Sequence, residues 1–172
     1  MRELDVLGVR VEMPTNQPIV LLRERGGERY LPIWIGAAEA TAIAYAQQGV
    51  VPPRPMTHDL LKNVIEELGH HLVEVRIVAL KESIFHATLV FDGAIEVSAR
   101  SSDAIALALR TGTSILVEDS LLDEAGVAIA AEEDDEVERF REFLDNVSAE
   151  DFDNPGEGGP AETWPPAPPP QG

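Results

Sequence analysis

Apolar and polar residues alternate along seven short stretches of the chain, which is the period of a β-strand with one buried face. These stretches predict strands at residues 4–13, 18–25, 28–35, 72–80, 83–91, 94–100 and 113–118. Short turn sequences join several of them, namely Gly26 and Gly27, Lys81 and Glu82, and Asp92 and Gly93. Because strands joined by such short turns pair antiparallel, the pattern predicts antiparallel meanders.

Three longer stretches have the pattern of helices, at residues 37–48, 57–68 and 101–111, and a helical turn is expected near 121–126. Thr57 is expected to cap the second helix, and Ser101 or Ser102 the third. The second helix carries apolar residues at the spacing of a face directed to the core: Leu60, Leu61, Val64, Ile65 and Leu68. The third is apolar almost all round, which predicts burial in the domain centre or in a subunit interface.

Runs of consecutive strands with helices between them favour an α+β domain over a doubly wound parallel sheet. We therefore expect residues 1–131 to form a mostly antiparallel sheet with helices packed on it. Residues 132–152 have apolar positions three and four apart behind a run of acids, which predicts an acidic amphipathic helix. From Asn154 onward, Pro and Gly fill 11 of the last 19 positions, so residues 153–172 are expected to be a disordered tail.

The charge of the chain changes which partners are expected. The 172 residues carry a formal net charge of -18, and residues 1–131 alone hold 18 acids against 11 bases. The predicted domain therefore lacks the basic surface of a dedicated nucleic-acid binder, and its contact with DNA or RNA is expected to be transient. The absence of Cys excludes a disulfide scaffold, a thiolate metal site and a Cys nucleophile. With neither a membrane-length apolar stretch nor a secretory signal, the expected location is the cytoplasm.

The sequence has none of the glycine-rich, HExxH or GxSxG motifs of nucleotide-binding proteins, zinc proteases and serine hydrolases. Three other segments stand out, at residues 31–40, 52–61 and 99–112, because each places polar side chains where a strand or loop leads into a helix. Such junctions can build a site.

Each junction has an acid in the first turn of its predicted helix. These acids are Glu39, Asp59 and Asp103, with His58 beside Asp59 and with Arg54, Arg100 and Arg110 in the same segments. If the carboxylates converge, they can hold Mg²⁺ or Mn²⁺ while the arginines bind phosphate. The simpler interpretation is that each acid is stabilised at the positive end of its helix dipole. The sequence leaves both interpretations open.

The segments LPIWIG, PRPMTHDLL and SSDAIALALRTG together resemble the bifunctional nuclease family of bacterial and plant proteins, over about residues 1–130. The resemblance implies an α+β domain that forms oligomers and degrades both DNA and RNA. From their chemistry, the expected catalytic residues are Glu39, His58, Asp59 and Asp103, with Asp59 and Asp103 as ligands of Mg²⁺ or Mn²⁺. The expected substrate-binding residues are Arg54, Arg100, Ser102 and Arg110.

Two functions of different classes follow. The first is metal-dependent hydrolysis of phosphodiester bonds in DNA and RNA. The second is a non-enzymatic regulatory or small-ligand-binding oligomer, in which the junction segments form subunit contacts; in either case a homo-oligomer, most simply a dimer, is expected. Acids and His58 gathered around a cleft within about 8 Å favour chemistry, whereas acids paired with the arginines favour a structural role.

Overall fold

One eight-stranded sheet organises residues 1–128, the part of the chain that the computed structural model describes. Its strands are β1 (Arg2–Glu12), β2 (Gln17–Glu24), β3 (Arg29–Trp34), β4 (Leu72–Lys81), β5 (Ile84–Phe91), β6 (Ile95–Arg100), β7 (Ser114–Val117) and β8 (Val127–Ala128). The helices are α1 (Ala37–Gln47), α2 (Thr57–Glu67), α3 (Ser101–Thr111) and α4 (Asp119–Ala125). The predicted helix at 132–152 and the predicted tail at 153–172 lie outside the described residues.

The sheet has the order β6-β5-β4-β7-β1-β2-β3-β8. Two antiparallel meanders, β1-β2-β3 and β4-β5-β6, lie on either side of β7, which pairs antiparallel with β1 and parallel with β4. The chain returns from β6 to β7 through α3, and this crossover accounts for the parallel pair. The α+β fold with a mostly antiparallel sheet is confirmed.

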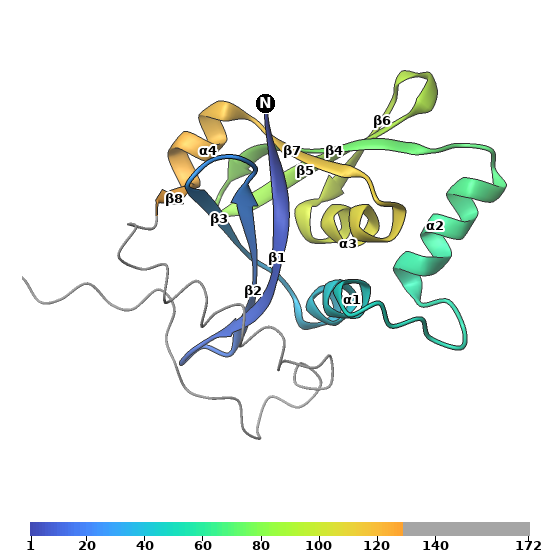
Figure 1. Cartoon of the computed structure of the whole chain (residues 1–172), viewed down its shortest axis with the longest axis horizontal. Helices are drawn as coiled ribbons and strands as arrows, with labels where there is room; N and C mark the ends of the chain where they lie inside the picture. Colours follow the sequence, from blue (N-terminus) through green and yellow to red (C-terminus); the bar gives the residue numbers. More distant parts are fainter. Residues whose placement is uncertain (129–172) are drawn as a thin grey trace, which may run out of the picture.

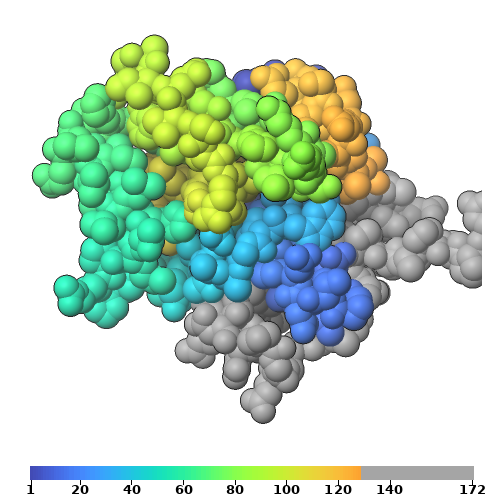
Figure 2. Space-filling model, turned by 180° about the vertical axis from the view of Figure 1, so that it is seen from behind, coloured from blue at the N-terminus to red at the C-terminus, as the bar shows by residue number. Residues whose placement is uncertain are grey.

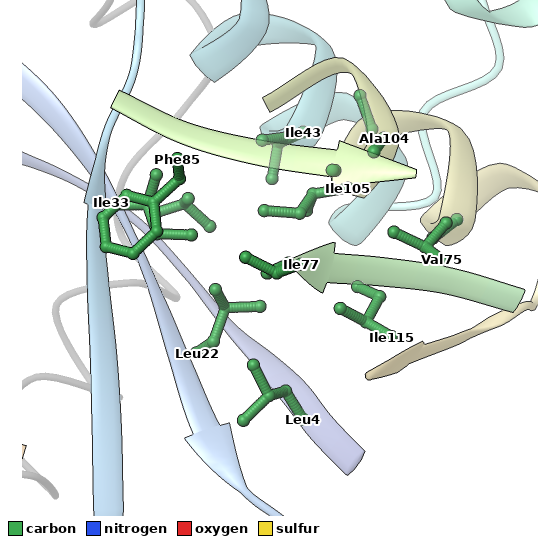
Figure 3. Packing of buried hydrophobic residues seen from close by; sticks show 14 of the residues in the cluster. Leu4, Leu22, Ile33, Ile43, Val75, Ile77, Phe85, Ala104, Ile105 and Ile115 are labelled. Atoms are coloured by element: carbon green, nitrogen blue, oxygen red, sulfur yellow. The ribbon is translucent and has the colours of Figure 1, made fainter. Parts of the chain in front are cut away.

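The core lies between the sheet and two helices, α1 and α3, which run side by side across it (Figure 1). Figure 3 shows Ile43 of α1 and Ile105 of α3 close to Ile77 of β4 in this core. Alanines on both helices, such as Ala40 and Ala104, are fully buried and allow close approach. The prediction that the third helix is buried is confirmed, because every residue of α3 from Ser101 to Ala108 except Asp103 is buried.

Helix α2 is oriented differently from the sequence prediction. Each of its residues is at least partly exposed: Leu60 is 53% exposed, and Leu68, the residue that follows the helix, is 71% exposed. Of the five apolar residues predicted to face the core, Ile65 packs against it, and the prediction is wrong for the other four. The apolar period shows which residues share a face, but it does not show which way that face is turned.

The predicted caps are also wrong. Met56 is the N-cap residue of α2 and Arg100 that of α3, so Thr57 and Ser101 are the first residues inside their helices. At α2 the backbone N–H of Met56 donates instead to Oδ2 of Asp59, at 3.0 Å. This bond fixes Asp59 at the beginning of α2. Within residues 1–128, no helix is long and apolar enough to cross a membrane.

Candidate functional site

Four of the candidate residues are in contact where α1, α2 and α3 begin. We call this group the junction network: Glu39, Arg100, Asp103 and His58. The Nη2 of Arg100 donates to Oε1 of Glu39 at 2.6 Å, and its Nε donates to Oδ2 of Asp103 at 2.8 Å. The Oδ1 of Asp103 lies 2.9 Å from Nε2 of His58. Residues from three helix junctions, up to 64 positions apart, therefore meet at one place.

The sequence around Glu39 leaves room for this arrangement. Gly36 precedes α1, and a Cβ atom at Gly36 would lie 2.3 Å from Oε2 of Glu39. Any larger residue at this position would displace the carboxylate that contacts Arg100. Gly36 is thus needed for the space that it leaves beside Glu39.

The network has a sheltered side and an exposed side. The side chains of Glu39 and His58 are each 13% exposed, whereas that of Arg100 is 66% exposed. The two carboxylates thus hold the guanidinium of Arg100 from within while its outer edge faces solvent. A planar guanidinium held in this way can bind an anion such as a phosphate.

The imidazole of His58 is fixed by one nitrogen. An ionised Asp103 can only accept, so the contact at 2.9 Å makes Nε2 of His58 the donor; whenever the ring carries a single proton, Nδ1 is then an acceptor. Among the described residues, Nδ1 has no hydrogen-bond partner. Partial burial raises the pKa of Asp103, but the hydrogen bonds from Arg100 and His58 outweigh it, so this pKa lies below its ordinary value.

Asp59 lies apart from this network in an ion pair of its own. Its Oδ1 accepts from Nε of Arg110 at 2.7 Å, while Nη1 of Arg110 donates to the carbonyl oxygen of Ala106 at 2.8 Å. Partial burial raises the pKa of Asp59. The hydrogen bonds from Arg110 and from the Met56 backbone lower it by more, so this pKa lies below its ordinary value. The Arg110 side chain is only 8% exposed, so this pair joins α2 to α3.

The remaining two candidates lie outside both groups. Ser102 is buried on α3 and forms no side-chain hydrogen bond within residues 1–128. Arg54 is exposed in the connection between α1 and α2, and in the same range it has no ion-pair partner. Arg54 is therefore available to bind an anion from solvent, and Ser102 is not.

The predicted ligation of Mg²⁺ or Mn²⁺ by Asp59 and Asp103 finds no support in this arrangement. All four carboxylate oxygens of these residues already accept hydrogen bonds, from two different arginines, His58 and a backbone N–H. The described residues contain no group of three or more His, Asp or Glu that could hold a metal ion. The side chains as arranged do not fit the ion, so the metal site stays a prediction.

Comparison with known protein families identifies the family of this chain. The model of the bifunctional nuclease domain matches residues 20–130, a range that contains all eight candidate residues. The chain belongs to the bifunctional nuclease domain family. The resemblance of the junction segments is thereby confirmed.

Two curated relatives of this bifunctional nuclease domain protein come from Mycobacterium tuberculosis. They are the uncharacterized proteins MT1877, of strain CDC 1551, and Rv1829, of strain H37Rv. Each is 57% identical to the chain over 161 residues, which cover 88% of this chain and 98% of the relative. The match therefore extends beyond the domain into the C-terminal region.

Proposed function

We propose that this protein hydrolyses phosphodiester bonds in DNA and RNA and that the junction network is its reactive site. The observation that carries the proposal is the contact of His58 with Asp103 at 2.9 Å. A carboxylate that holds one imidazole nitrogen fixes the ring and leaves the other nitrogen free to exchange protons. Membership of the bifunctional nuclease domain family supports the choice of reaction.

In the proposed reaction, Nδ1 of His58 takes a proton from a water molecule as the water oxygen forms a bond to phosphorus. The bond between phosphorus and the leaving oxygen breaks, and the protonated imidazole gives its proton to that oxygen. Water is thus added across the broken bond, and His58 returns to its starting state. Asp103 keeps the second proton of the ring on Nε2 throughout.

Arg100 supplies the positive charge that the reaction needs. Its exposed guanidinium binds the nonbridging oxygens of the phosphate, where negative charge increases in the transition state. Glu39 acts through Arg100 as a positioning residue, because its contact at 2.6 Å fixes the guanidinium plane. Exposed Arg54 is suited to a neighbouring phosphate of the same strand.

The proposed substrates include both nucleic acids because the reaction requires only the phosphodiester and water. A 2′-hydroxyl takes no part in it, and only the phosphate backbone is contacted. The acidic chain, with its net charge of -18, repels long polyanions, so binding depends on these few arginines. We therefore expect weak binding and slow turnover.

Whether the cleavage activity depends on a divalent metal ion is a separate part of the proposal. If Mg²⁺ or Mn²⁺ were ligated by Asp59 and Asp103, Arg110 and Arg100 would first have to release these carboxylates. Activity is therefore measured in EDTA, in Mg²⁺ and in Mn²⁺. Activity that survives EDTA is expected from the His58 route, and strict dependence on the ion would contradict that route.

The second candidate function is a non-enzymatic regulatory or small-ligand-binding protein, and one observation favours it. Each candidate acid is paired with an arginine: Glu39 and Asp103 with Arg100, and Asp59 with Arg110. Such pairs also occur where they only join helices. If the protein is a nuclease, loss of Asp103 lowers activity. If it is a non-enzymatic binding protein, loss of Asp103 changes stability alone.

The experiment compares cleavage of single-stranded and duplex DNA and RNA by the wild type, Asp103→Asn and Asp92→Asn, purified identically. Asp92 is the matched control, because its Oδ1 lies 2.8 Å from Nδ1 of His70 in a more exposed His–Asp pair away from the junction network. We expect Asp103→Asn to lose about 10²-fold or more in rate, and Asp92→Asn to keep the wild-type rate. Equal rates in all three proteins would mean a contaminating nuclease and would overturn the proposal.

A further inference from the structure

Strand β2 is buried on both of its faces, although the core of the domain lies on only one of them. The five residues from Pro18 to Leu22 are all buried, whereas burial alternates along a strand that has one covered face. Val20 and Leu22 belong to the core cluster. Ile19 and Leu21 are 6% and 4% exposed, and they point to the opposite side of the sheet and lie outside that cluster.

We call this opposite side of β1, β2 and β3 the outer face, and alternate residues of the strands form it. The strand register places these residues side by side: Ile19, Leu21 and Arg23 of β2, and Trp34, Pro32 and Tyr30 of β3. Tyr30 is buried as well, and so is Gly8, which stands opposite Leu21 on β1 and has no side chain of its own. Burial of this extent requires a cover over the outer face.

None of the four helices within residues 1–128 covers the outer face. The buried apolar residues of α1, α3 and α4 all belong to the core cluster, on the other side of the sheet. Helix α2 has no buried residue and packs against α3. The burial of Ile19, Leu21 and Tyr30 is that of a single chain, so it does not require a second copy.

We propose that the cover is residues 137–147 of the same chain, which pack as a helix across the outer face. This docking does not depend on the proposed hydrolysis. The segment has apolar residues at intervals of three and four, which place them on one side of a helix: Val137, Phe140, Phe143, Leu144 and Val147. Its two phenylalanines offer the large apolar area that Ile19, Leu21 and Tyr30 need for their burial.

The described chain ends beside the outer face. Strand β8 pairs with β3, with Val127 opposite Tyr30, so β2 lies two strand spacings, or about 10 Å, from β8. Val137 follows nine residues after Ala128, and nine residues span up to about 31 Å. A helix over residues 137–147 is about 16 Å long, and β1 and β3 lie about 10 Å apart. One helix can therefore reach the outer face and cover all three strands.

The exposed apolar residues of α2 are the other surface on which an apolar helix could dock. Figures 1 and 2 show β8 and the β1-β2-β3 meander on the side of the molecule away from α2. Leu60 and Leu68 of α2 remain exposed in the same single chain in which Ile19 and Leu21 are buried. The outer face is therefore the better site for the segment.

The charges also favour the outer face. Arg23 lies over the ring of Tyr30, 5.9 Å from its centroid, and has no ion-pair partner within residues 1–128. Asp5, which is opposite Arg23 on β1, is already paired with Arg25. Five consecutive acids, at residues 132–136, directly precede the apolar residues of the segment. A chain that leaves β8 beside Tyr30 brings these acids toward Arg23, which attracts them.

The first test locates the segment in the full-length protein by NMR. Because the chain has no Cys, Asn146→Cys accepts a single nitroxide spin label beside the proposed contact. We expect the label to broaden the signals of the Leu21 methyl groups and the Trp34 indole, and to leave those of Leu68 on α2 sharp. Broadening at Leu68 instead, or none on the outer face, would overturn the proposal. Equal broadening when the label and the NMR isotopes are on different chains would mean that a second copy supplies the segment, which would also overturn it.

The second test compares the melting temperatures of the full-length wild type, Phe143→Asp and Asn146→Asp. Both substitutions add one negative charge, but only residue 143 belongs to the apolar side of the segment. We expect Phe143→Asp to lower the melting temperature by about 5 °C or more, because it places a carboxylate against Ile19 and Leu21, and Asn146→Asp to leave it unchanged. Equal melting temperatures of all three proteins would contradict the docking.

The spin-label test decides if Phe143→Asp fails to fold, because Asn146→Cys leaves the apolar residues of the segment in place. Neither readout uses nuclease activity, so a failure here is separate from a failure of the proposed function.

Discussion

At the scale of single residues, each carboxylate of the junction network is held by close hydrogen bonds. Two acids hold Arg100: Asp103, which also contacts His58, and Glu39, for which Gly36 provides the space. Loss of a hydrogen bond between charged groups costs about 1.5–3 kcal/mol, and about 1.4 kcal/mol changes a rate tenfold. Small displacements in this network should therefore be measurable as changes in rate.

Gly36→Ala tests whether the position of Glu39 matters for activity. The added Cβ displaces the Glu39 carboxylate from Arg100, and we expect cleavage to slow about tenfold. Gly27→Ala is the control, because its Cβ would lie equally close, at 2.3 Å, to Oε2 of Glu24, a carboxylate paired with Arg29. The control should lower the melting temperature without slowing cleavage per folded molecule. An unchanged rate in Gly36→Ala would remove Glu39 from the site.

At the scale of elements, α2 is attached to the rest of the fold mainly by polar contacts. Its inner face meets α3 through the pairs of His58 with Asp103 and of Asp59 with Arg110. Ile65 adds a partly buried apolar contact. The residues proposed to carry the chemistry thus also hold α2 against α3.

Arg110→Lys tests the second of these attachments. Lysine keeps the charge but cannot donate both to Asp59 and to the carbonyl oxygen of Ala106, as Arg110 does. We expect the free energy of unfolding to fall by about 1.5–3 kcal/mol in urea denaturation. Arg54→Lys, at an exposed arginine, should leave it unchanged. Equal stability of the two variants would mean that the Asp59–Arg110 pair does not stabilise the fold.

The elements themselves could be predicted from the sequence because their signals are local. Alternation located β1 to β7 to within a few residues, but the two-residue β8 is too short to produce a pattern. Two features depend on tertiary packing: the direction in which the apolar residues of α2 point, and the pairing of Glu39 with Arg100, 61 residues apart. Arg100 stands only three residues before Asp103, so this one contact of the site is local in sequence.

At the scale of the whole molecule, paired carboxylates link stability to pH. Five acids in the described residues have a pKa below the ordinary value because arginines, histidines or the N-terminal amine bind them: Glu24, Asp59, Asp92, Asp103 and Asp119. A lowered pKa in the folded state means that stability is present above the unfolded value of about 4 and is lost as pH falls.

We therefore expect the melting temperature to fall as the pH is lowered from about 5 to about 3. Asp103→Asn removes one of these groups and should flatten the profile. The 31 acids of the chain also repel one another, and protonation relieves that repulsion. A melting temperature that rises on acidification would show that this relief outweighs the loss of the paired carboxylates.

The central claim is that His58, held by Asp103, carries out the proton transfers of phosphodiester cleavage. The most direct measurement is the rate of cleavage of a single-stranded substrate by His58→Gln, set against His70→Gln, which alters the other His–Asp pair. We expect His58→Gln to lose about 10²-fold or more in rate while it remains folded, and His70→Gln to keep the wild-type rate. Equal rates for the wild type and folded His58→Gln would contradict it.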